Sequence, residues 1–250
     1  RGTCKTCKGM AIARGNRKIA RPLMSIRREG PVTERLLQLL RTHPGPDAAR
    51  TGSLDAPIAP HSSMSRRQAV AIFESAIQSR LQDLLSRELK DKGISYYTIG
   101  SAGHEANAIA GDLLRGTDTA FLHYRSGAFM AARLRKGKGE TPFFDAMLSF
   151  CASAEDPISG GRHKVLGSAS MHVPPQTSTI ASHLPKAIGF AIALQRLERQ
   201  GIAPSNGVPH DSIVYWSFGA ASMSDAPAQA GLHAGGAAVP QKPPCRVLFS

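Results

Sequence analysis

The folded part of the chain is predicted to begin with a long amphipathic helix. Ser65 is a favourable N-cap residue, and large apolar side chains recur after it at three- and four-residue spacing. They are Val70, Phe73, Ile77, Leu81 and Leu84. The pattern stops near Gly93, a residue type that commonly terminates helices. We therefore expect one amphipathic helix over 65–93, of the kind that packs its apolar stripe on a core.

Short apolar runs alternate with helical segments further along. The runs Thr119–Leu122 and Ile213–Trp216 are typical of short buried strands, and a third run, Val247–Phe249, follows near the end of the sequence. Helices are predicted over His104–Leu114, Ala128–Leu134, Thr141–Phe150 and Ile180–Arg199, and over a small-residue segment that ends near Gly236. This alternation indicates an α/β fold with a mainly parallel sheet flanked by helices.

The stretch 152–176 shows no periodicity. It contains three glycines and three prolines, so we predict a long irregular loop, a type of segment that is often functional or mobile in a compact domain. Within it, a solvated basic loop tip is one of two interpretations of Arg162-His163-Lys164, the other being that His163 lines a pocket.

The first 63 residues differ in composition from the rest. Residues 1–50 hold 12 Lys and Arg against 3 Asp and Glu, which is most of the chain's net charge of +13. One short helix is predicted near Thr33–Arg41. The stretch Thr42–Ser63 is rich in Pro, Gly, Ser and Ala and is predicted to be a linker. We expect 1–63 to be a basic, disordered extension and 64–250 to be the folded domain. Nucleic-acid binding by this extension is the alternative, which the lack of Phe, Tyr and Trp in 1–50 disfavours.

Cysteine usage and hydropathy indicate the compartment. Four scattered cysteines do not make a disulfide framework, which fits a reducing cytoplasm. Cys4 and Cys7 form one CxxC pair without further Cys or His ligands nearby, so no zinc site is predicted there. No apolar run approaches the length of a membrane span, and no secretory signal is visible at Arg1, which is not an initiating Met.

Candidate binding residues follow two of the predicted strands. His123-Tyr124-Arg125 comes directly after the first strand, and Ser217-Phe218-Gly219 follows the second. Ligands of parallel sheets bind beyond the carboxyl ends of the strands. The guanidinium of Arg125 suits a phosphate, and Tyr124 adds a hydroxyl donor. These residues therefore predict an anion site at this edge of the sheet.

Four segments, in order, resemble the α subunit of thiamine diphosphate-dependent 2-oxoacid dehydrogenases (the E1 component), most closely the branched-chain type. They are Tyr96–Ala106, His123–Gly127, Thr177–Gly189 and Ser217–Ser222, and the resemblance covers about 64–250. It implies the thiamine diphosphate-binding fold, truncated at the C-terminus, or a chain that continues into a fused β region. It also implies the activity of this family, 2-oxoacid dehydrogenation.

The resemblance assigns roles to individual residues. Tyr124 and Arg125 would hold the cofactor's diphosphate. The aminopyrimidine ring would lie near Ser178 and Ile180, and the turn of Gly219, Ala221 and Ser222 would face a phosphate. His123 and His183 would line the catalytic pocket, and His163 and His172 are weaker candidates of the same kind. Glu105 is expected to cap or orient its helix rather than to act on the cofactor.

The implied reaction is the oxidative decarboxylation of a 2-oxoacid, branched-chain or pyruvate, with acyl transfer to a lipoyl domain of an E2 partner. The implied cofactors are thiamine diphosphate and Mg²⁺, and the implied partner is an E1 β-type subunit in a homo- or hetero-oligomer. Ala220 stands where we expect an acidic metal ligand, and the rest of the metal motif would follow Ser250, so no residue is assigned as a metal ligand. The alternative is therefore a degenerate or truncated, non-catalytic α-type domain that pairs with a β-type partner.

Overall fold

The computed structural model describes residues 31–43, 52–96, 99–137, 141–205, 207–238, 240 and 244–250. The chain divides into two units, Arg1–Gly45 and Pro46–Ser250. In the first unit the described part is helix α1 (Pro31–Thr42), which confirms the short helix predicted near Thr33–Arg41. Of the predicted basic extension, residues 1–30, with Cys4 and Cys7, and residues 44–51 lie outside the described residues.

The second unit is built on a small parallel sheet. Strands β1 (Ala120–Phe121), β4 (Val214–Trp216) and β5 (Val247–Phe249) lie in the order β1-β4-β5. Both pairings are parallel, with Phe121 opposite Trp216 and Trp216 opposite Phe249. The predicted parallel α/β arrangement is therefore confirmed.

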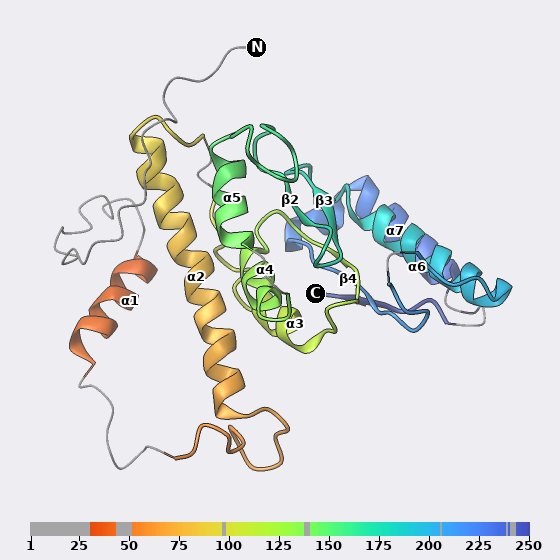
Figure 1. Ribbon diagram of the computed structural model, residues 1–250, viewed down its shortest axis with the longest axis horizontal. Coiled ribbons are helices and arrows are strands. Elements are labelled where there is room, and N and C mark those ends of the chain that lie inside the picture. Colours follow the sequence, from red (N-terminus) through yellow and green to blue (C-terminus); the bar gives the residue numbers. More distant parts are fainter. Residues whose placement is uncertain are drawn as a thin grey trace. The chain divides into compact units, whose positions relative to one another are not determined.

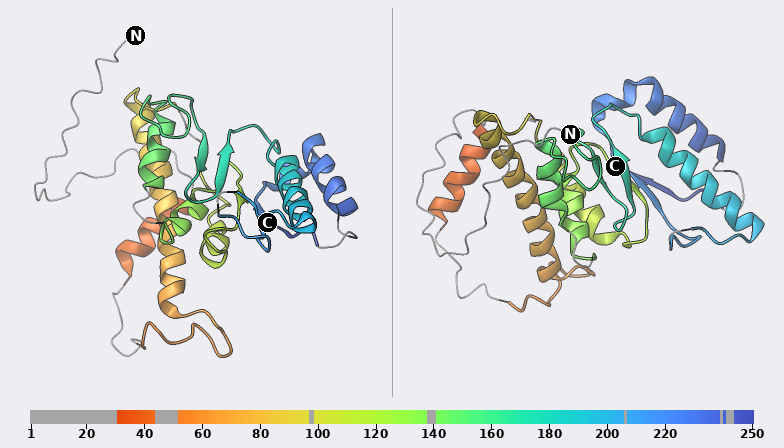
Figure 2. Two further views of the ribbon diagram at one scale, coloured as in Figure 1. Left: turned by 45° about the vertical axis from the view of Figure 1, so that its right-hand side comes forward. Right: turned by 45° about the horizontal axis from the view of Figure 1, so that its top comes forward.

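Helices cover both faces of this sheet, because successive side chains of a strand point to opposite sides. On one face, Phe121, Val214 and Trp216 form a core with α6 (Leu184–Gln200) and Ala228 of α7 (Ala226–Ala238). Figures 1 and 2 show α6 and α7 side by side. On the other face, Tyr215 stacks on Phe129 of α4 (Gly127–Leu134), with ring centroids 5.1 Å apart. Helix α3 (Asn107–Leu113) packs on α4 behind this layer.

The long helix α2 (Arg66–Asp91) forms as predicted, but its burial is the reverse of the predicted one. The hydroxyl of Ser65 caps it by accepting a hydrogen bond from the N–H of Gln68 at 3.1 Å. Val70, Phe73 and Leu81 are 48%, 60% and 54% exposed. The buried side chains of α2 are instead polar, namely Ser75, Ser79, Gln82, Asp83 and Ser86.

Close approach to α4 and α5 (Pro142–Phe150) explains this inversion. A methyl group at Gly127 would lie 2.8 Å from the Ser79 hydroxyl, so only small side chains fit between α2 and α4. The longer polar groups have partners. Gln82 donates to the Phe143 carbonyl at 3.1 Å, and Asp83 accepts from the hydroxyl of Ser101 at 2.7 Å. The apolar stripe therefore faces away from the core.

Two further segments differ from the sequence-based expectation. The predicted irregular loop contains an antiparallel ribbon of β2 (Leu166–Ser168) and β3 (Val173–Gln176), whose Gly167 and two prolines conceal the strand pattern. The helix predicted from Ile180 begins at Leu184, because Ala181 has a left-handed φ of 57° and Pro185 occupies the first helical turn. In addition, part of the predicted linker folds onto the start of α2, where Arg66 N–H donates to Ala56 O at 2.9 Å.

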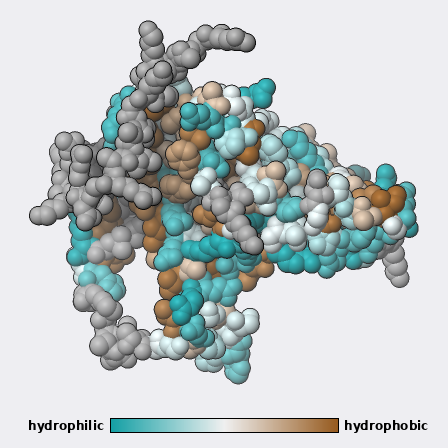
Figure 3. Space-filling view, viewed as in Figure 1, coloured by the Kyte–Doolittle hydropathy of each residue, from teal (hydrophilic) through white to brown (hydrophobic). Residues whose placement is uncertain are grey.

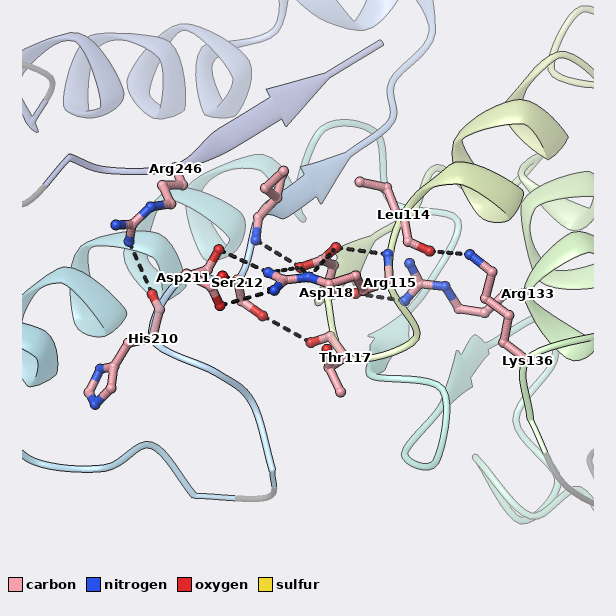
Figure 4. Close-up of polar contacts among 11 residues, drawn as sticks. Leu114, Arg115, Thr117, Asp118, Arg133, Lys136, His210, Asp211, Ser212 and Arg246 are labelled. Carbon is pink, nitrogen blue, oxygen red and sulfur yellow. Dashed lines mark hydrogen bonds and ion pairs between the residues drawn. The ribbon is translucent and has the colours of Figure 1, made fainter. Parts of the chain in front are cut away.

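A polar cluster joins the amino ends of β1 and β4 (Figure 4). The buried carboxylate of Asp118 accepts hydrogen bonds from the N–H groups of Arg115 and Ile213, both at 2.9 Å. The Arg115 guanidinium also bridges Asp118 to Asp211 at 3.0 and 2.9 Å. Burial by itself would raise the pKa of Asp118, but these hydrogen bonds outweigh it and hold that pKa below its usual value. The cluster fixes the two strands at the end opposite to the predicted site.

Candidate functional site at the carboxyl ends of β1 and β4

The segments after β1 and β4 meet through a buried serine. The hydroxyl of Ser217 accepts a hydrogen bond from the N–H of His123 at 2.9 Å and lies 2.8 Å from the hydroxyl of Ser126. Ser217 N–H in turn donates to the Phe121 carbonyl at 3.1 Å. Two of the predicted site segments, His123–Arg125 and Ser217–Gly219, are therefore brought together by the register of the parallel strands.

A group of aromatic and imidazole rings surrounds His123. His104 stacks on it with ring centroids 4.5 Å apart, and the Tyr124 ring lies 4.0 Å away. The ring of His183, at the start of α6, lies edge-on at 6.5 Å. The histidines His123 and His183, predicted from opposite parts of the sequence, are thus neighbours in one cluster.

The His123 ring is neutral at physiological pH. Burial lowers its pKa to about 3, and the nearby His104, His183 and Arg125 add to the effect. Its Nδ1 atom accepts a hydrogen bond from the N–H of Arg125 at 3.3 Å, so the neutral ring carries its proton on Nε2. That nitrogen lies close to Gly219, since a methyl group added to Gly219 would be 3.5 Å from it. His123 is therefore a neutral N–H donor facing the turn after β4.

The unused hydrogen-bonding atom of His183 is an acceptor, whereas that of His123 is a donor. Its Nε2 atom lies 2.7 Å from the Ser217 carbonyl, and since a carbonyl only accepts, Nε2 carries the proton. Nδ1 is then an acceptor, and it is buried without a hydrogen-bond partner among the described residues. Burial lowers the pKa of His183, although the Ser217 carbonyl acts in the opposite direction. The cluster thus presents one donor, on His123, and one unused acceptor, on His183.

Arg125 and Tyr124 lie beside this cluster. The Arg125 guanidinium donates to the Gly100 carbonyl, and its carbon lies 5.4 Å from the centre of the Tyr124 ring. Gly100 precedes Ser101, whose N–H and hydroxyl both bind the Asp83 carboxylate. Arg125, which was predicted to bind a phosphate, is therefore oriented by the glycine-rich loop that comes before α3.

Lys164 is a charged member of the site region that the sequence did not reveal. The alternative interpretation of this segment as a solvated loop tip does not hold for Lys164, because only 7% of the residue is exposed. Its ammonium nitrogen lies 4.0 Å from the centre of the Phe150 ring, and burial lowers its pKa to about 7. Burial also raises the pKa of Asp83 nearby. A small hollow is lined by Asp83, Ser101, Tyr124, Arg125 and Lys164 together with neighbouring residues.

The other predicted site residues lie on the loop before α6, in the turn after β4 and beside strands β2 and β3. Ser178 and Ile180 are exposed on the loop before α6. Gly219 caps a short 3₁₀ helix over Ala220–Ser224, in which Ala221 is exposed. The N–H of Ser222 donates to the Gly219 carbonyl at 2.8 Å, so in this conformation it is engaged within the turn. His163 forms an edge-on ring contact with Tyr96 at 6.1 Å, and His172 has a left-handed φ of 52°.

Glu105, which was expected to cap or orient its helix, does not cap α3, since no side chain makes a capping hydrogen bond at the N-cap residue Ala106. Its carboxylate accepts a hydrogen bond from the N–H of Gly103 at 2.8 Å, which fixes the turn before α3. Beside it, the pKa of His104 is lowered by burial and by Arg125.

The described residues do not form a recognisable metal site. Among them, no three His, Cys, Asp or Glu side chains are grouped in a way that could hold an ion. Ala220 is exposed at the start of its 3₁₀ helix and offers no side-chain ligand. The Mg²⁺ expected from the resemblance therefore has no side-chain cluster to bind it in the part of the chain that the structure describes.

Comparison with known proteins does not assign a family, since neither a family model nor a curated protein matches this chain. None of the helices in the described ranges is both long and apolar enough to cross a membrane.

Proposed function

We propose that this chain is the α-type region of a thiamine diphosphate-dependent 2-oxoacid dehydrogenase E1, and that it binds the cofactor's diphosphate beyond β1 and β4. The observation that carries the proposal is the convergence of His123, Tyr124 and Arg125 with the Ser217–Gly219 turn at two adjacent parallel strand ends. This is the position at which open α/β sheets bind phosphate-bearing ligands.

The polar groups of the candidate site fit an organic diphosphate in part. Arg125 supplies a cation, and Tyr124 a hydroxyl donor, for anionic oxygens. The unused Nδ1 acceptor of His183 suits an N–H or O–H of a ligand, and Nε2–H of His123 suits an oxygen. The metal does not fit, because the described residues supply no acidic cluster for it. The proposal therefore includes no step that passes through Mg²⁺.

When bound, thiamine diphosphate supplies the carbon chemistry of decarboxylation, and the protein supplies orientation and electrostatics. The chain's own histidines act here as hydrogen-bonding groups. An efficient proton shuttle needs a pKa near the working pH, and the pKa of His123 is about 3. His123 is therefore suited to orient and polarise an oxygen as a neutral donor. Proton transfer by this residue is not favoured.

The proposed substrate is a 2-oxoacid, branched-chain or pyruvate, and the proposed partners are an E1 β-type subunit or region and an E2 lipoyl domain. The second candidate is the non-catalytic α-type domain that pairs with a β-type partner. The specific observation in its favour is Ala220, an exposed residue without a ligand atom at the expected metal position.

Calorimetric titration of thiamine diphosphate, with and without Mg²⁺, into the 250-residue chain tests both candidates. The titration is done with the chain alone and with an E1 β-type subunit. Cofactor binding that requires the β-type subunit supports the enzyme, and the titrations with and without Mg²⁺ show whether the metal contributes to that binding. A complex with the β-type subunit that takes up no cofactor supports the non-catalytic candidate, and no binding of cofactor or subunit contradicts both.

Substitution of Arg125 tests the site itself. Arg125→Ala is expected to weaken binding of the diphosphate by about 1.5–3 kcal/mol, the usual contribution of a hydrogen bond to a charged group. Arg196→Ala, at an exposed position of α6, is the matched control and should leave the affinity unchanged. An equal affinity of the two variants would remove Arg125 from the diphosphate site.

A further inference from the structure

Helix α2 carries an exposed apolar stripe that the fold of its own unit does not cover. Val70, Phe73 and Leu81 are each about half exposed or more, at 48%, 60% and 54%. Ile77 and Leu84, which complete the stripe, are partly exposed. At 3.6 residues per turn all five positions fall within about 80° of one another around the helix. Figure 3 shows apolar surface along the course of α2.

The spacing of this stripe is symmetric. From Val70 to Leu84 the intervals are three, four, four and three residues, with Ile77 at the centre. If a second α2 ran antiparallel across the first at Ile77, Phe73 would lie opposite Leu81 of the second copy. Val70 would lie opposite its Leu84, and Ile77 opposite its Ile77. Every apolar side chain of the stripe would then meet an apolar partner, which is the self-complementarity of a twofold interface.

The charges at the ends of the stripe follow the same symmetry. Arg66 and Glu88 lie eleven residues before and after Ile77, on the same side of the helix as the stripe. In the antiparallel pair, Arg66 of each copy would meet Glu88 of the other. Glu88 is bound to Lys92 of its own helix at 2.6 Å, but both of these side chains are about half exposed. An exposed ion pair contributes little, so Glu88 can exchange that partner readily.

From these observations we propose that two copies of this chain associate through α2, antiparallel about a twofold axis at Ile77. The inference is independent of the cofactor site, since the stripe faces away from the core that supports β1 and β4. A second copy is favoured over an unrelated partner because both the apolar spacing and the charge order are self-complementary.

The length of the stripe determines how strongly the two copies are expected to associate. The 26 residues of α2 make a helix of about 39 Å, and the stripe occupies a little more than half of it. A contact of this length is at the small end of specific interfaces, where association is reversible. We therefore expect a monomer–dimer equilibrium rather than a permanent dimer.

Sedimentation velocity of the 250-residue chain over about two decades of concentration around the micromolar range tests the proposal. The expected result is a concentration-dependent dimer. Leu81→Glu should weaken the association about tenfold or more, since a charge would face Phe73 of the other copy. The matched control is Ile202→Glu, at a residue of similar exposure (51%) in the loop after α6, and it should associate like the parent chain.

Charge exchange tests the register. Arg66→Glu alone should weaken the dimer several-fold, because it places two carboxylates opposite each other. Arg66→Glu combined with Glu88→Arg should restore it. If the double variant associates no better than the single one, the antiparallel pairing of these residues is contradicted.

Disulfide trapping tests the direction of the helices in a chain whose native cysteines are replaced by serine. Ile77→Cys should cross-link to itself, and a mixture of Val70→Cys and Leu84→Cys should form a mixed disulfide. Efficient self-cross-linking of Val70→Cys would instead indicate a parallel pair and overturn the proposal. A chain that stays monomeric throughout would also overturn it, and a different protein would then be the partner of this stripe.

Discussion

At the scale of single residues, the buried position of Lys164 is the feature that differs most from what the sequence suggests. In the sequence it belongs to a run of basic residues that resembles an exposed loop tip. In the structure its backbone has a left-handed φ of 56°, and its side chain is turned inward against Phe150. A left-handed turn at a lysine has no sequence signature, because glycine or asparagine is the usual residue there. The inward orientation was therefore not predictable from residue types.

Replacing this lysine should stabilise the protein. The pKa of Lys164 falls from 10.5 to about 7 on folding, so its burial opposes folding at every pH below 10.5. We expect Lys164→Met, which keeps the length and removes the charge, to raise the free energy of unfolding at pH 7 by roughly 1–3 kcal/mol. Loss of the attraction between Lys164 and Asp83 offsets part of the gain.

The pH dependence of this gain identifies its cause. Below pH 7 the lysine is protonated in both states, so the difference between Lys164→Met and the parent should be constant. Between pH 7 and 10.5 only the unfolded chain holds the proton, and the difference should shrink as the pH rises. Urea unfolding of both proteins at pH 6, 7 and 9 measures it. A destabilised variant, or a gain that grows with pH, would contradict this account.

At the scale of helices and strands, close packing is concentrated where α3 crosses α4. A methyl group at Gly111 would lie 2.6 Å from the backbone oxygen of Phe129, which is too close for the helices to keep their distance. Gly189 of α6 is different, since no atom lies within 4 Å of such a methyl group. Substitutions at these two glycines therefore test helix packing and helix propensity independently.

We expect Gly111→Ala to lower the free energy of unfolding by about 1–3 kcal/mol, because the backbone of α4 must move to accept the methyl group. Gly189→Ala should instead raise it by up to about 1 kcal/mol, the gain in helix propensity. Chemical denaturation of both variants measures the difference. Equal effects of the two substitutions would show that α3 and α4 are not in tight contact at Gly111.

The cluster at the amino ends of β1 and β4 gives a second contrast. Asp118→Ala should lower the free energy of unfolding by about 1–3 kcal/mol, because it leaves the N–H of Ile213 without its acceptor. Asp211→Ala removes a carboxylate that is 65% exposed and should change it by about 1 kcal/mol or less. Urea unfolding distinguishes the two. A small effect of Asp118→Ala would mean that the strand ends are held by other contacts.

The elements that were predicted correctly from the sequence are those whose residues follow a local pattern. The strands β1, β4 and β5 and the helices α1, α4 and α5 follow local patterns and were predicted within two residues. The buried face of α2 was not, because it is decided by the small residues of the helices across from it. The start of α6 was predicted four residues early, since the apolar pattern continues through the left-handed Ala181.

At the scale of the whole molecule, the candidate site follows from topology. Parallel pairing of β1 and β4 places His123 and Ser217 together although 94 residues separate them. The expectation that both strand ends share one site was therefore open to sequence reasoning. The contribution of His104 was not, because its stacking on His123 depends on how the turn before α3 is folded.

The buried histidines also predict the acid sensitivity of the molecule. His104, His123 and His183 all have a pKa lowered chiefly by burial, so between that pKa and about 6.5 the unfolded chain binds more protons than the folded one. The free energy of unfolding must then fall as the pH falls. Each fully buried histidine contributes a slope of up to about 1.4 kcal/mol per pH unit. Asp83, whose pKa is raised by burial, acts in the opposite direction toward the lower end of this range.

We expect the parent chain to lose roughly 2–4 kcal/mol of unfolding free energy between pH 7 and pH 5, measured by urea denaturation at half-unit steps. His123→Gln keeps a neutral polar side chain but removes a titrating group, so its slope should be smaller by up to about 1.4 kcal/mol per pH unit. If His123→Gln and the parent have the same slope, His123 is protonated in the folded state at pH 5. Its assignment as a neutral donor facing Gly219 would then be wrong.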